Sequence, residues 1–238
     1  MIRRALIACF VTVFVLNGFA LAATKSHAKS TAKMAKMPAK LSDKPVGAEV
    51  AFVTAIQADL MKRFPTAADA EKAGYVRYTN EDNTGAISYA NQQWQSADAQ
   101  HPSQLWYDVK GNLLGADFSV LKSTSATPPQ LWGVNPKRWL DFKHPHYHWI
   151  VKDPKTGALK YGATGGKKYA AAGGVVDKPT ADVVVKLGEA TAAADVVTTF
   201  EFPALWDLQV WVKPNPNGAF AEKNPSVTPS KDAEHGSM

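Results

Sequence analysis

The chain has 238 residues and a formal net charge of +6 at pH 7. Eight of its basic residues lie in the first 44 positions, and without them and Asp43 the segment 45–238 keeps 19 basic and 20 acidic side chains. The part long enough to fold is therefore not basic, which argues against a nucleic-acid partner. The single cysteine, Cys9, lies in the N-terminal segment 1–23, which we expect to be removed as a signal peptide (see below). We therefore expect no disulfide, no thiolate metal site and no haem c in the mature protein.

Residues 1–23 have the pattern of a secretory signal peptide. Arg3 and Arg4 precede an apolar run, and the Ala-Leu-Ala tripeptide at 20–22 offers the small side chains that a signal peptidase requires. We expect cleavage near Ala23 and a periplasmic or secreted protein. An uncleaved membrane anchor is the alternative, because the apolar run is nearly long enough to cross a bilayer.

Composition divides the rest of the chain into three parts. Residues 24–45 are rich in Lys, Ala, Ser and Thr and predict a disordered tail, which could contact anionic surfaces weakly. Residues 46–228 contain the large apolar side chains and predict a single globular β-rich domain. Residues 229–238 predict a disordered C-terminus.

The domain begins with helical patterns. Residues 46–64 place apolar side chains at three- and four-residue steps, which predicts a helix that ends before Pro65. The stripe consists of Val50, Val53, Ile56, Leu60 and Phe64. Residues 66–74 predict a short second helix, because Thr66 and Asp69 have the spacing of a capping box.

Most of the remaining domain predicts antiparallel β-structure. Pairs of β-prone segments flank short turns, as in hairpins, at 75–79 with 86–90, 104–109 with 113–121, and 147–152 with 158–163. Further strands are predicted at 181–187, 195–202 and 205–213. The predicted fold class is α+β, mainly β, with N-terminal helices followed by an antiparallel sheet of about six to eight strands in a curved sheet or sandwich.

The glycine-rich segment 162–169, GATGGKKY, differs from a phosphate-binding loop. Its glycine-to-lysine spacing is one residue short, and Lys168 stands where Ser or Thr would bind magnesium. We therefore expect a flexible loop here and no nucleotide cofactor.

Three histidines recur at every second position in the segment FKHPHYHWIVKDP. On a strand, His144, His146 and His148 would share one face, with neighbouring members about 6.6 Å apart and the outer two about 13 Å apart. One metal ion can bridge two neighbours but not all three. Because Pro145 disfavours regular pairing for His144, the strand is predicted to begin at His146.

His146 and His148 thus predict half of a zinc or copper site, since these ions take at least three or four ligands. His101 and His144 are the candidates for completing it. The alternative is an ordinary strand with a polar face and no metal.

The chain also has seven tryptophans. In 205–213, Trp206 falls on the apolar face, whereas Trp211 falls on the same face as the polar residues. The candidate ligand-binding residues are Tyr147, Trp149, Asp141 and Trp211. The alternative is that the large aromatic side chains build the core.

These patterns predict an exported, non-catalytic domain with a histidine-lined site for a metal or small ligand. One alternative is an envelope enzyme that uses the histidine cluster as acid and base. The other is a structural or surface-interaction protein without a pocket. The sequence assigns no catalytic residue and no oligomeric state.

Overall fold

The computed structural model describes residues 41–94 and 97–234, so the expected signal and residues 24–40 of the expected tail lie outside the described part. Its helices are α1 (Ala48–Arg63), α2 (Ala67–Lys72), α3 (Gly166–Ala171) and α4 (Ala181–Lys186), with 3₁₀ turns η1 (Gln92–Trp94), η2 (Pro136–Arg138) and η3 (Ala193–Asp195). Its strands are β1 (Val76–Arg77), β2 (Ile87–Ala90), β3 (Gln104–Tyr107), β4 (Leu113–Leu121), β5 (Leu140–Phe142), β6 (His146–Lys152), β7 (Leu159–Gly165), β8 (Val196–Phe202) and β9 (Leu205–Trp211). Within the described residues, we find no helix with the length and apolar character needed to span a membrane.

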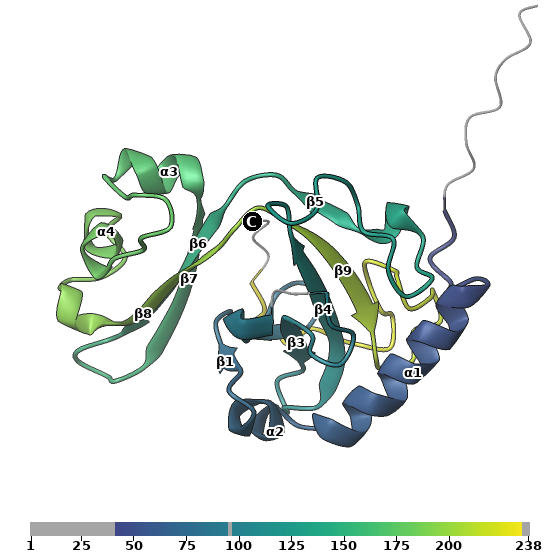
Figure 1. Cartoon of the computed structure of the whole chain (residues 1–238). Coiled ribbons are helices and arrows are strands. Elements are labelled where there is room, and N and C mark those ends of the chain that lie inside the picture. Colours follow the sequence, from purple (N-terminus) through teal and green to yellow (C-terminus); the bar gives the residue numbers. More distant parts are fainter. Residues whose placement is uncertain (1–40, 95–96, 235–238) are drawn as a thin grey trace, which may run out of the picture. The chain divides into compact units, whose positions relative to one another are not determined.

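The strands form two antiparallel sheets (Figure 1). The larger sheet has six strands in the order β1-β2-β3-β4-β9-β5, and the smaller has three in the order β7-β6-β8. The three predicted hairpins are present as the pairs β1–β2, β3–β4 and β6–β7. The predicted α+β, mainly β class is confirmed, with nine strands in two sheets among the described residues.

Helix α1 covers one face of the six-stranded sheet (Figure 1). Phe52 meets Phe118 of β4 edge to face, with ring centroids 5.9 Å apart. Ile56 and Leu60 belong to the same buried cluster. The predicted apolar stripe is shifted at its start, because Val50 is 48% exposed and Phe52 takes the buried position.

The start of α2 follows the predicted capping pattern. The Thr66 side chain accepts a hydrogen bond from the backbone N–H of Asp69, and the Asp69 carboxylate accepts one from the backbone N–H of Thr66. Gly74 follows the helix with φ of +87°, a conformation that favours glycine. Local sequence thus determines both ends of this helix.

Strands β4 and β9 alternate between the two faces of the large sheet. Phe118 and Leu208 face α1 in the apolar core. Asp117, Asp207 and Trp211 belong to the opposite set, and all three are buried as well. The polar face of these strands is therefore not a solvent face.

The small sheet is covered on one face by α3 and α4 (Figure 1). Tyr147 stacks on Tyr169 of α3 with ring centroids 3.7 Å apart. Trp149 and Val151 pack with Val184 of α4. As predicted, these side chains of β6 point away from His146 and His148.

Three segments differ from the sequence-based expectation. Residues 181–187, predicted as a strand, form α4, because packing of its valines onto β6 outweighs the β-preference of those side chains. Residues 162–169, predicted as a flexible loop, end β7 and begin α3, since Gly165 still pairs with His146. Strand β5 was not predicted; it pairs with β9 at the sheet edge.

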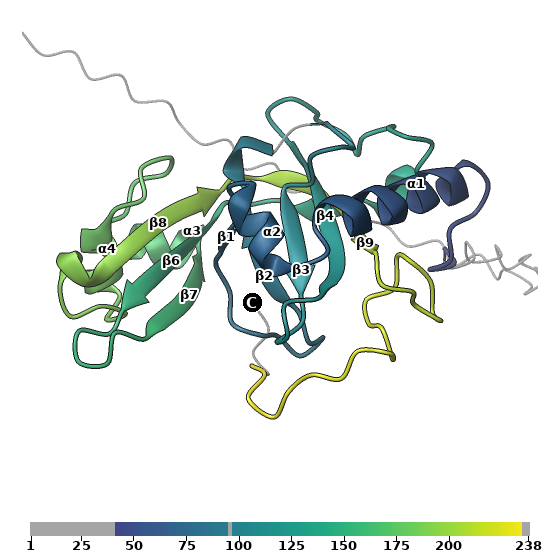
Figure 2. The same ribbon diagram turned by 90° about the horizontal axis from the view of Figure 1, so that it is seen from below.

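The packed contacts extend beyond residues 46 and 228. The guanidinium of Arg138 donates hydrogen bonds to the backbone oxygens of Ser42 and Lys44. Near the other end, the backbone N–H of Glu234 donates to the backbone oxygen of Glu81. Figure 2 shows the yellow segment after β9 looping away and then returning toward the first strands.

Candidate functional site

A cavity of about 560 Å³ is lined by side chains from both sheets and from the segment after β1. The large sheet contributes Ser88, Gln104, Trp106, Asp117, Asp207, Gln209 and Trp211. The small sheet contributes His146, His148, Tyr161, Gly162, Ala163 and Phe202. The cavity therefore lies against the polar face of β4 and β9 and the histidine face of β6.

His146 and His148 line the cavity side by side. Strand β6 begins at His146, as the position of Pro145 predicted, and the two imidazole ring centroids are 5.1 Å apart. The His148 ring meets Tyr78 edge to face at 4.8 Å, and it is only 1% exposed. Neither of its ring nitrogens has a hydrogen-bond partner among the described residues.

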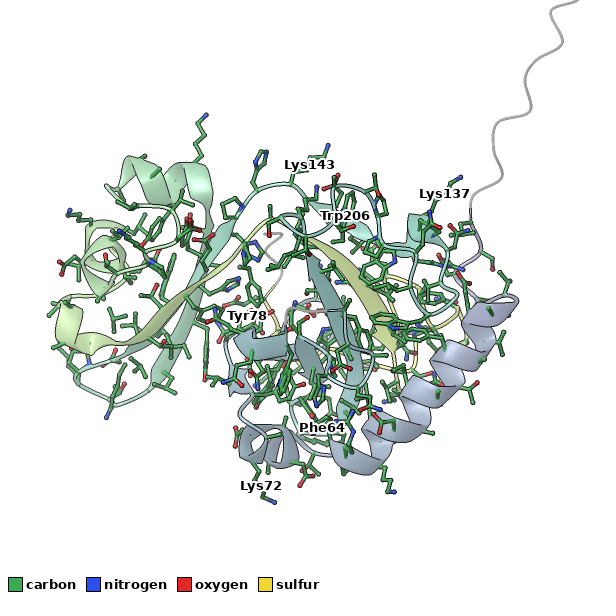
Figure 3. The ribbon with its side chains drawn as sticks, in the orientation of Figure 1. Phe64, Lys72, Tyr78, Lys137, Lys143 and Trp206 are labelled. Atoms are coloured by element: carbon green, nitrogen blue, oxygen red, sulfur yellow. The ribbon has the colours of Figure 1, made fainter. Side chains whose placement is uncertain are left out.

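Tyr78 connects this histidine wall to the large sheet. Figure 3 shows its side chain in the region between the small sheet and the start of the large one. Its ring contacts those of His148 and Phe202, and its hydroxyl donates a hydrogen bond to Gln104 Oε1. One buried aromatic residue thus touches both walls of the cavity.

Burial keeps both histidines neutral. It lowers the pKa of His146, and burial together with the charge of His146 lowers the pKa of His148 to about 3. Neutral imidazole has one nitrogen lone pair free, which can accept a hydrogen bond or bind a metal ion. The pair therefore offers two uncharged acceptors at neutral pH.

Two buried carboxyl groups form the opposite wall. Asp117 of β4 and Asp207 of β9 lie diagonally on one face of the sheet, because Asp117 pairs with Gln209 and Ser119 pairs with Asp207. Asp207 Oδ1 accepts a hydrogen bond from Ser119 Oγ at 2.8 Å. Asp117 Oδ2 accepts one from Trp106 Nε1 at 3.0 Å, but its Oδ1 is buried without a partner in residues 41–94 and 97–234.

The acid pair has no cationic partner among the described residues. Burial and the nearby charge of Asp207 raise the pKa of Asp117 well above its usual value, although the Trp106 hydrogen bond opposes the change. Burial raises the pKa of Asp207 to about 7, against opposing hydrogen bonds from Ser119 and Gln209. The pair therefore holds a proton near neutral pH, which it can release to solvent or to a bound molecule.

Two tryptophans complete the wall beside the carboxyl groups. Trp106 and Trp211 meet edge to face with ring centroids 5.6 Å apart. Trp211 Nε1 donates to the backbone oxygen of Ala221 at 2.6 Å. Trp106 lies so close over Gly115 that a Cβ there would be 2.3 Å from its ring. Trp211, the candidate that sequence alternation placed among polar residues, therefore lines the cavity.

The other candidate residues lie elsewhere. Tyr147 and Trp149 are buried beneath α3 and α4, on the opposite face of β6. Asp141, which belongs to β5, forms an ion pair with Lys122. His144 is exposed and precedes the start of β6. None of these four lines the cavity.

His101 does not join the histidine pair. Its ring stacks on Trp94 at 4.1 Å, and its Nδ1 is 2.6 Å from Asp98 Oδ2. In the part of the chain that the structure describes, no three His, Cys, Asp or Glu side chains are grouped closely enough to hold one metal ion. A metal on His146 and His148 would therefore need water or a bound molecule as its other ligands.

Sequence analysis missed the acid pair. Both aspartates stand inside long apolar strands, LLGADFSVL and LWDLQVW, and this was the available signal. An ionisable residue within an apolar strand is rarely buried without a function or a partner. That the two meet on one face depends on the β4–β9 register, which the sequence does not show.

The chain was compared with protein-family models, with curated proteins and with solved structures, and none of the three comparisons gave a match. The function must therefore be inferred from the cavity and its side chains.

Proposed function

We propose that this protein is exported and binds a small polar molecule in the cavity between its histidine and aspartate walls. The observation that carries the proposal is the presence of unpartnered buried polar atoms on both walls, Asp117 Oδ1 and the ring nitrogens of His148. An unpartnered buried polar atom costs about 1–3 kcal/mol, and a bound molecule that pairs with it recovers part of that cost.

The size and lining of the cavity support the same proposal. Its volume of about 560 Å³ lies within the range of roughly 300–1,000 Å³ that is common for small-molecule sites. The wall combines aromatic rings with a few convergent polar groups, which is the usual composition of such sites. We expect the polar groups to orient the ligand and the rings to contact its apolar part.

Blocking the cavity tests the proposal. Ser88 lies on the cavity wall in β2 and is half-buried, so the Ser88→Phe variant should fill part of the space. Ser123 is exposed and outside the cavity lining, which makes Ser123→Phe the matched control. Saturation-transfer NMR with a panel of small sugars, amines and carboxylic acids should detect binders to the wild type and the control.

The Ser88→Phe variant should lose these signals while its circular dichroism spectrum stays unchanged. If the panel binds equally to Ser88→Phe and to the wild type, the cavity is not the binding site. If nothing in the panel binds to the wild type, small-molecule binding as proposed is wrong.

Metal binding at His146 and His148 is a second candidate, favoured by their 5.1 Å ring separation and by the unpartnered nitrogens of His148. Calorimetric titration with Zn²⁺ and Cu²⁺ should show binding that a His146→Ala, His148→Ala double variant loses and a His144→Ala, His101→Ala double variant keeps. Because both pKa values are lowered, acid should weaken this binding at a lower pH than it weakens binding to ordinary histidines. Equal affinity of the wild type and the first double variant would remove this candidate.

Acid–base catalysis is a third candidate, favoured by the proton that Asp117 and Asp207 hold near neutral pH. NMR spectra of each panel member recorded over several hours with the protein would detect turnover. A catalytic role requires that Asp117→Asn abolish any conversion without abolishing binding.

Export itself is proposed from the signal-like pattern of residues 1–23. N-terminal sequencing of the protein from fractionated cells should find a mature chain that begins near Thr24, outside the cytoplasm. Deletion of residues 24–40 should weaken any binding to anionic vesicles if the lysine-rich tail contacts such surfaces.

A further inference from the structure

The charged side chains that line the cavity are all acidic. Five of the lining residues are acidic, and none of the lining residues is Lys or Arg. The acidic residues are Asp82, Asp117, Asp207, Glu222 and Glu234. Asp117 and Asp207 are 3% and 2% exposed and have no ion-pair partner in the described part of the chain. A buried carboxylate is stable only when it is paired with a cation or protonated, so the wall favours a cationic ligand.

The two walls of the cavity together present two hydrogen-bond acceptors without a donor among the described residues. Among the described residues, Asp117 Oδ1 has no donor, and neither nitrogen of His148 has a partner, so the neutral ring presents one free acceptor nitrogen and one free N–H. The Gln104 oxygen, by contrast, already accepts from Tyr78. A primary ammonium group has three N–H donors, and it can therefore donate to both of these acceptors.

Aromatic side chains indicate that the cation is organic. Trp106, Trp211, Tyr78 and Phe202 line the same cavity as the carboxyl groups. Aromatic rings attract cations and contact apolar groups, and a cavity of about 560 Å³ has room for a carbon skeleton beside the charge. An inorganic ion would leave most of this volume and the aromatic wall without contact.

We propose that the cavity binds an organic primary ammonium ion, with the ammonium group at Asp117 and Asp207 and the carbon skeleton against the tryptophans. This inference rests on the proposed small-molecule function and names the chemical class of its ligand. Binding of the cation displaces the proton that the acid pair holds in the free protein, so one proton leaves for solvent as the ammonium group enters.

Three probes of similar shape test the charge preference: phenethylamine, 2-phenylethanol and 3-phenylpropanoate, which are cationic, neutral and anionic at pH 7.5. Isothermal titration calorimetry of the wild-type protein should give at least tenfold higher affinity for the amine than for the alcohol, and the lowest affinity for the carboxylate. Tryptophan fluorescence should change on binding, because Trp106 and Trp211 line the cavity.

Two further measurements test whether the preference for the amine depends on Asp117 and Asp207. Asp117→Asn should lower the affinity for the amine at least tenfold and leave the affinity for the alcohol within twofold, whereas Asp232→Asn, at an exposed acid outside the cavity, should change neither. If Asp117→Asn does not fold, the wild type still provides a test. Its affinity for the amine should rise from pH 5.5 to 8 as the pair loses its proton, and its affinity for the alcohol should not.

Equal affinity for amine and alcohol, or a preference for the carboxylate, would overturn the cation inference and leave the cavity as a small-molecule site. An amine preference that Asp117→Asn and pH both leave unchanged would also overturn it. If none of the probes binds at millimolar concentration, the inference fails, and the Ser88→Phe screen alone then decides the proposed function.

Discussion

Two buried acidic sites in this protein have opposite surroundings. Glu49 of α1 is 2% exposed, and its carboxylate accepts two hydrogen bonds from Arg138, at 3.1 and 3.0 Å. The backbone N–H groups of Val46 and Asn135 donate two more. Both oxygens of the Glu49 carboxylate are therefore hydrogen-bonded, and its negative charge is paired with the guanidinium of Arg138.

Asp117 and Asp207 are buried to a similar degree, and neither forms an ion pair with a cation in the described part of the chain. One carboxyl oxygen of Asp117 has no partner among the described residues, and the charge that acts on this carboxyl group is that of another acid, Asp207. Burial alone would raise the pKa of Glu49, but the hydrogen bonds and charge of Arg138 outweigh it and lower that pKa, whereas burial raises the pKa of Asp207 to about 7. Complete pairing is what a structural site requires, and the missing partners beside the cavity are what support the proposed ligand site.

The largest expected loss of stability follows from removing the Glu49–Arg138 pair. Arg138→Ala leaves Glu49 buried without its cation, and such losses cost about 3–5 kcal/mol of unfolding free energy. Urea denaturation at pH 7 measures this cost. Lys137→Ala is the control, because Lys137 is exposed and points away from the fold in Figure 3, and it should change stability by less than about 0.5 kcal/mol. A loss below about 1 kcal/mol in Arg138→Ala would contradict the structural role.

Opposite pH responses sharpen the comparison. The folded protein keeps protons on the Asp117–Asp207 pair that the unfolded chain has released, so stability falls as pH rises from roughly 4 to 7, by about 1.4 kcal/mol per pH unit for each proton held. Glu49 acts in the other direction, and its contribution is lost as pH falls below its usual value of 4.5. Urea denaturation between roughly pH 2 and 8 measures both pH responses.

The double variant Asp117→Asn, Asp207→Asn should flatten the decline between pH 4 and 7, whereas Asp232→Asn should keep it. A double variant with the same slope as the wild type would show that the pair does not hold the proton.

A smaller effect is expected at the glycine beneath Trp106. In Gly115→Ala the added Cβ would lie 2.3 Å from the Trp106 ring and 2.7 Å from the Val210 oxygen, so the indole must move. We expect a stability loss of about 1–3 kcal/mol and loss of the hydrogen bond from Trp106 Nε1 to Asp117. The indole N–H signal in NMR spectra reports this bond. Gly165→Ala controls for glycine replacement without a clash, since Gly165 has an extended backbone conformation and no described atom lies within 4 Å of its Cβ position.

The smallest effect is expected at His148. Its ring makes aromatic contacts but no hydrogen bond in the described part of the chain, so His148→Leu removes an unpartnered polar group and keeps an apolar side chain. Stability should change by less than about 1 kcal/mol, while amine or metal binding at the cavity should fall. His144→Leu, at an exposed position, should affect neither property. A loss above about 2 kcal/mol in His148→Leu would mean that the imidazole has a structural partner.

Much of the fold followed from short-range patterns. The apolar stripe of α1 from Val53 onward, the capping box of Thr66 and Asp69 and the three hairpins depend on spacing and turn residues, and each is present. The prediction failed at 181–187, where a valine-rich segment forms a helix because it packs on β6. Single-sequence propensity cannot include such a partner.

For the site, the sequence by itself determined which side chains share a face. Two-residue periodicity placed His146 with His148, and Trp211 with Asp207, because side chains alternate along any strand. The tertiary structure alone decided what those faces meet. The β4–β9 register brings Asp117 beside Asp207, and the contacts of Tyr78 bring the histidine strand to the same cavity. Pairing between strands more than 80 residues apart depends on the packing of the whole domain, so it cannot be predicted from the spacing of nearby residues.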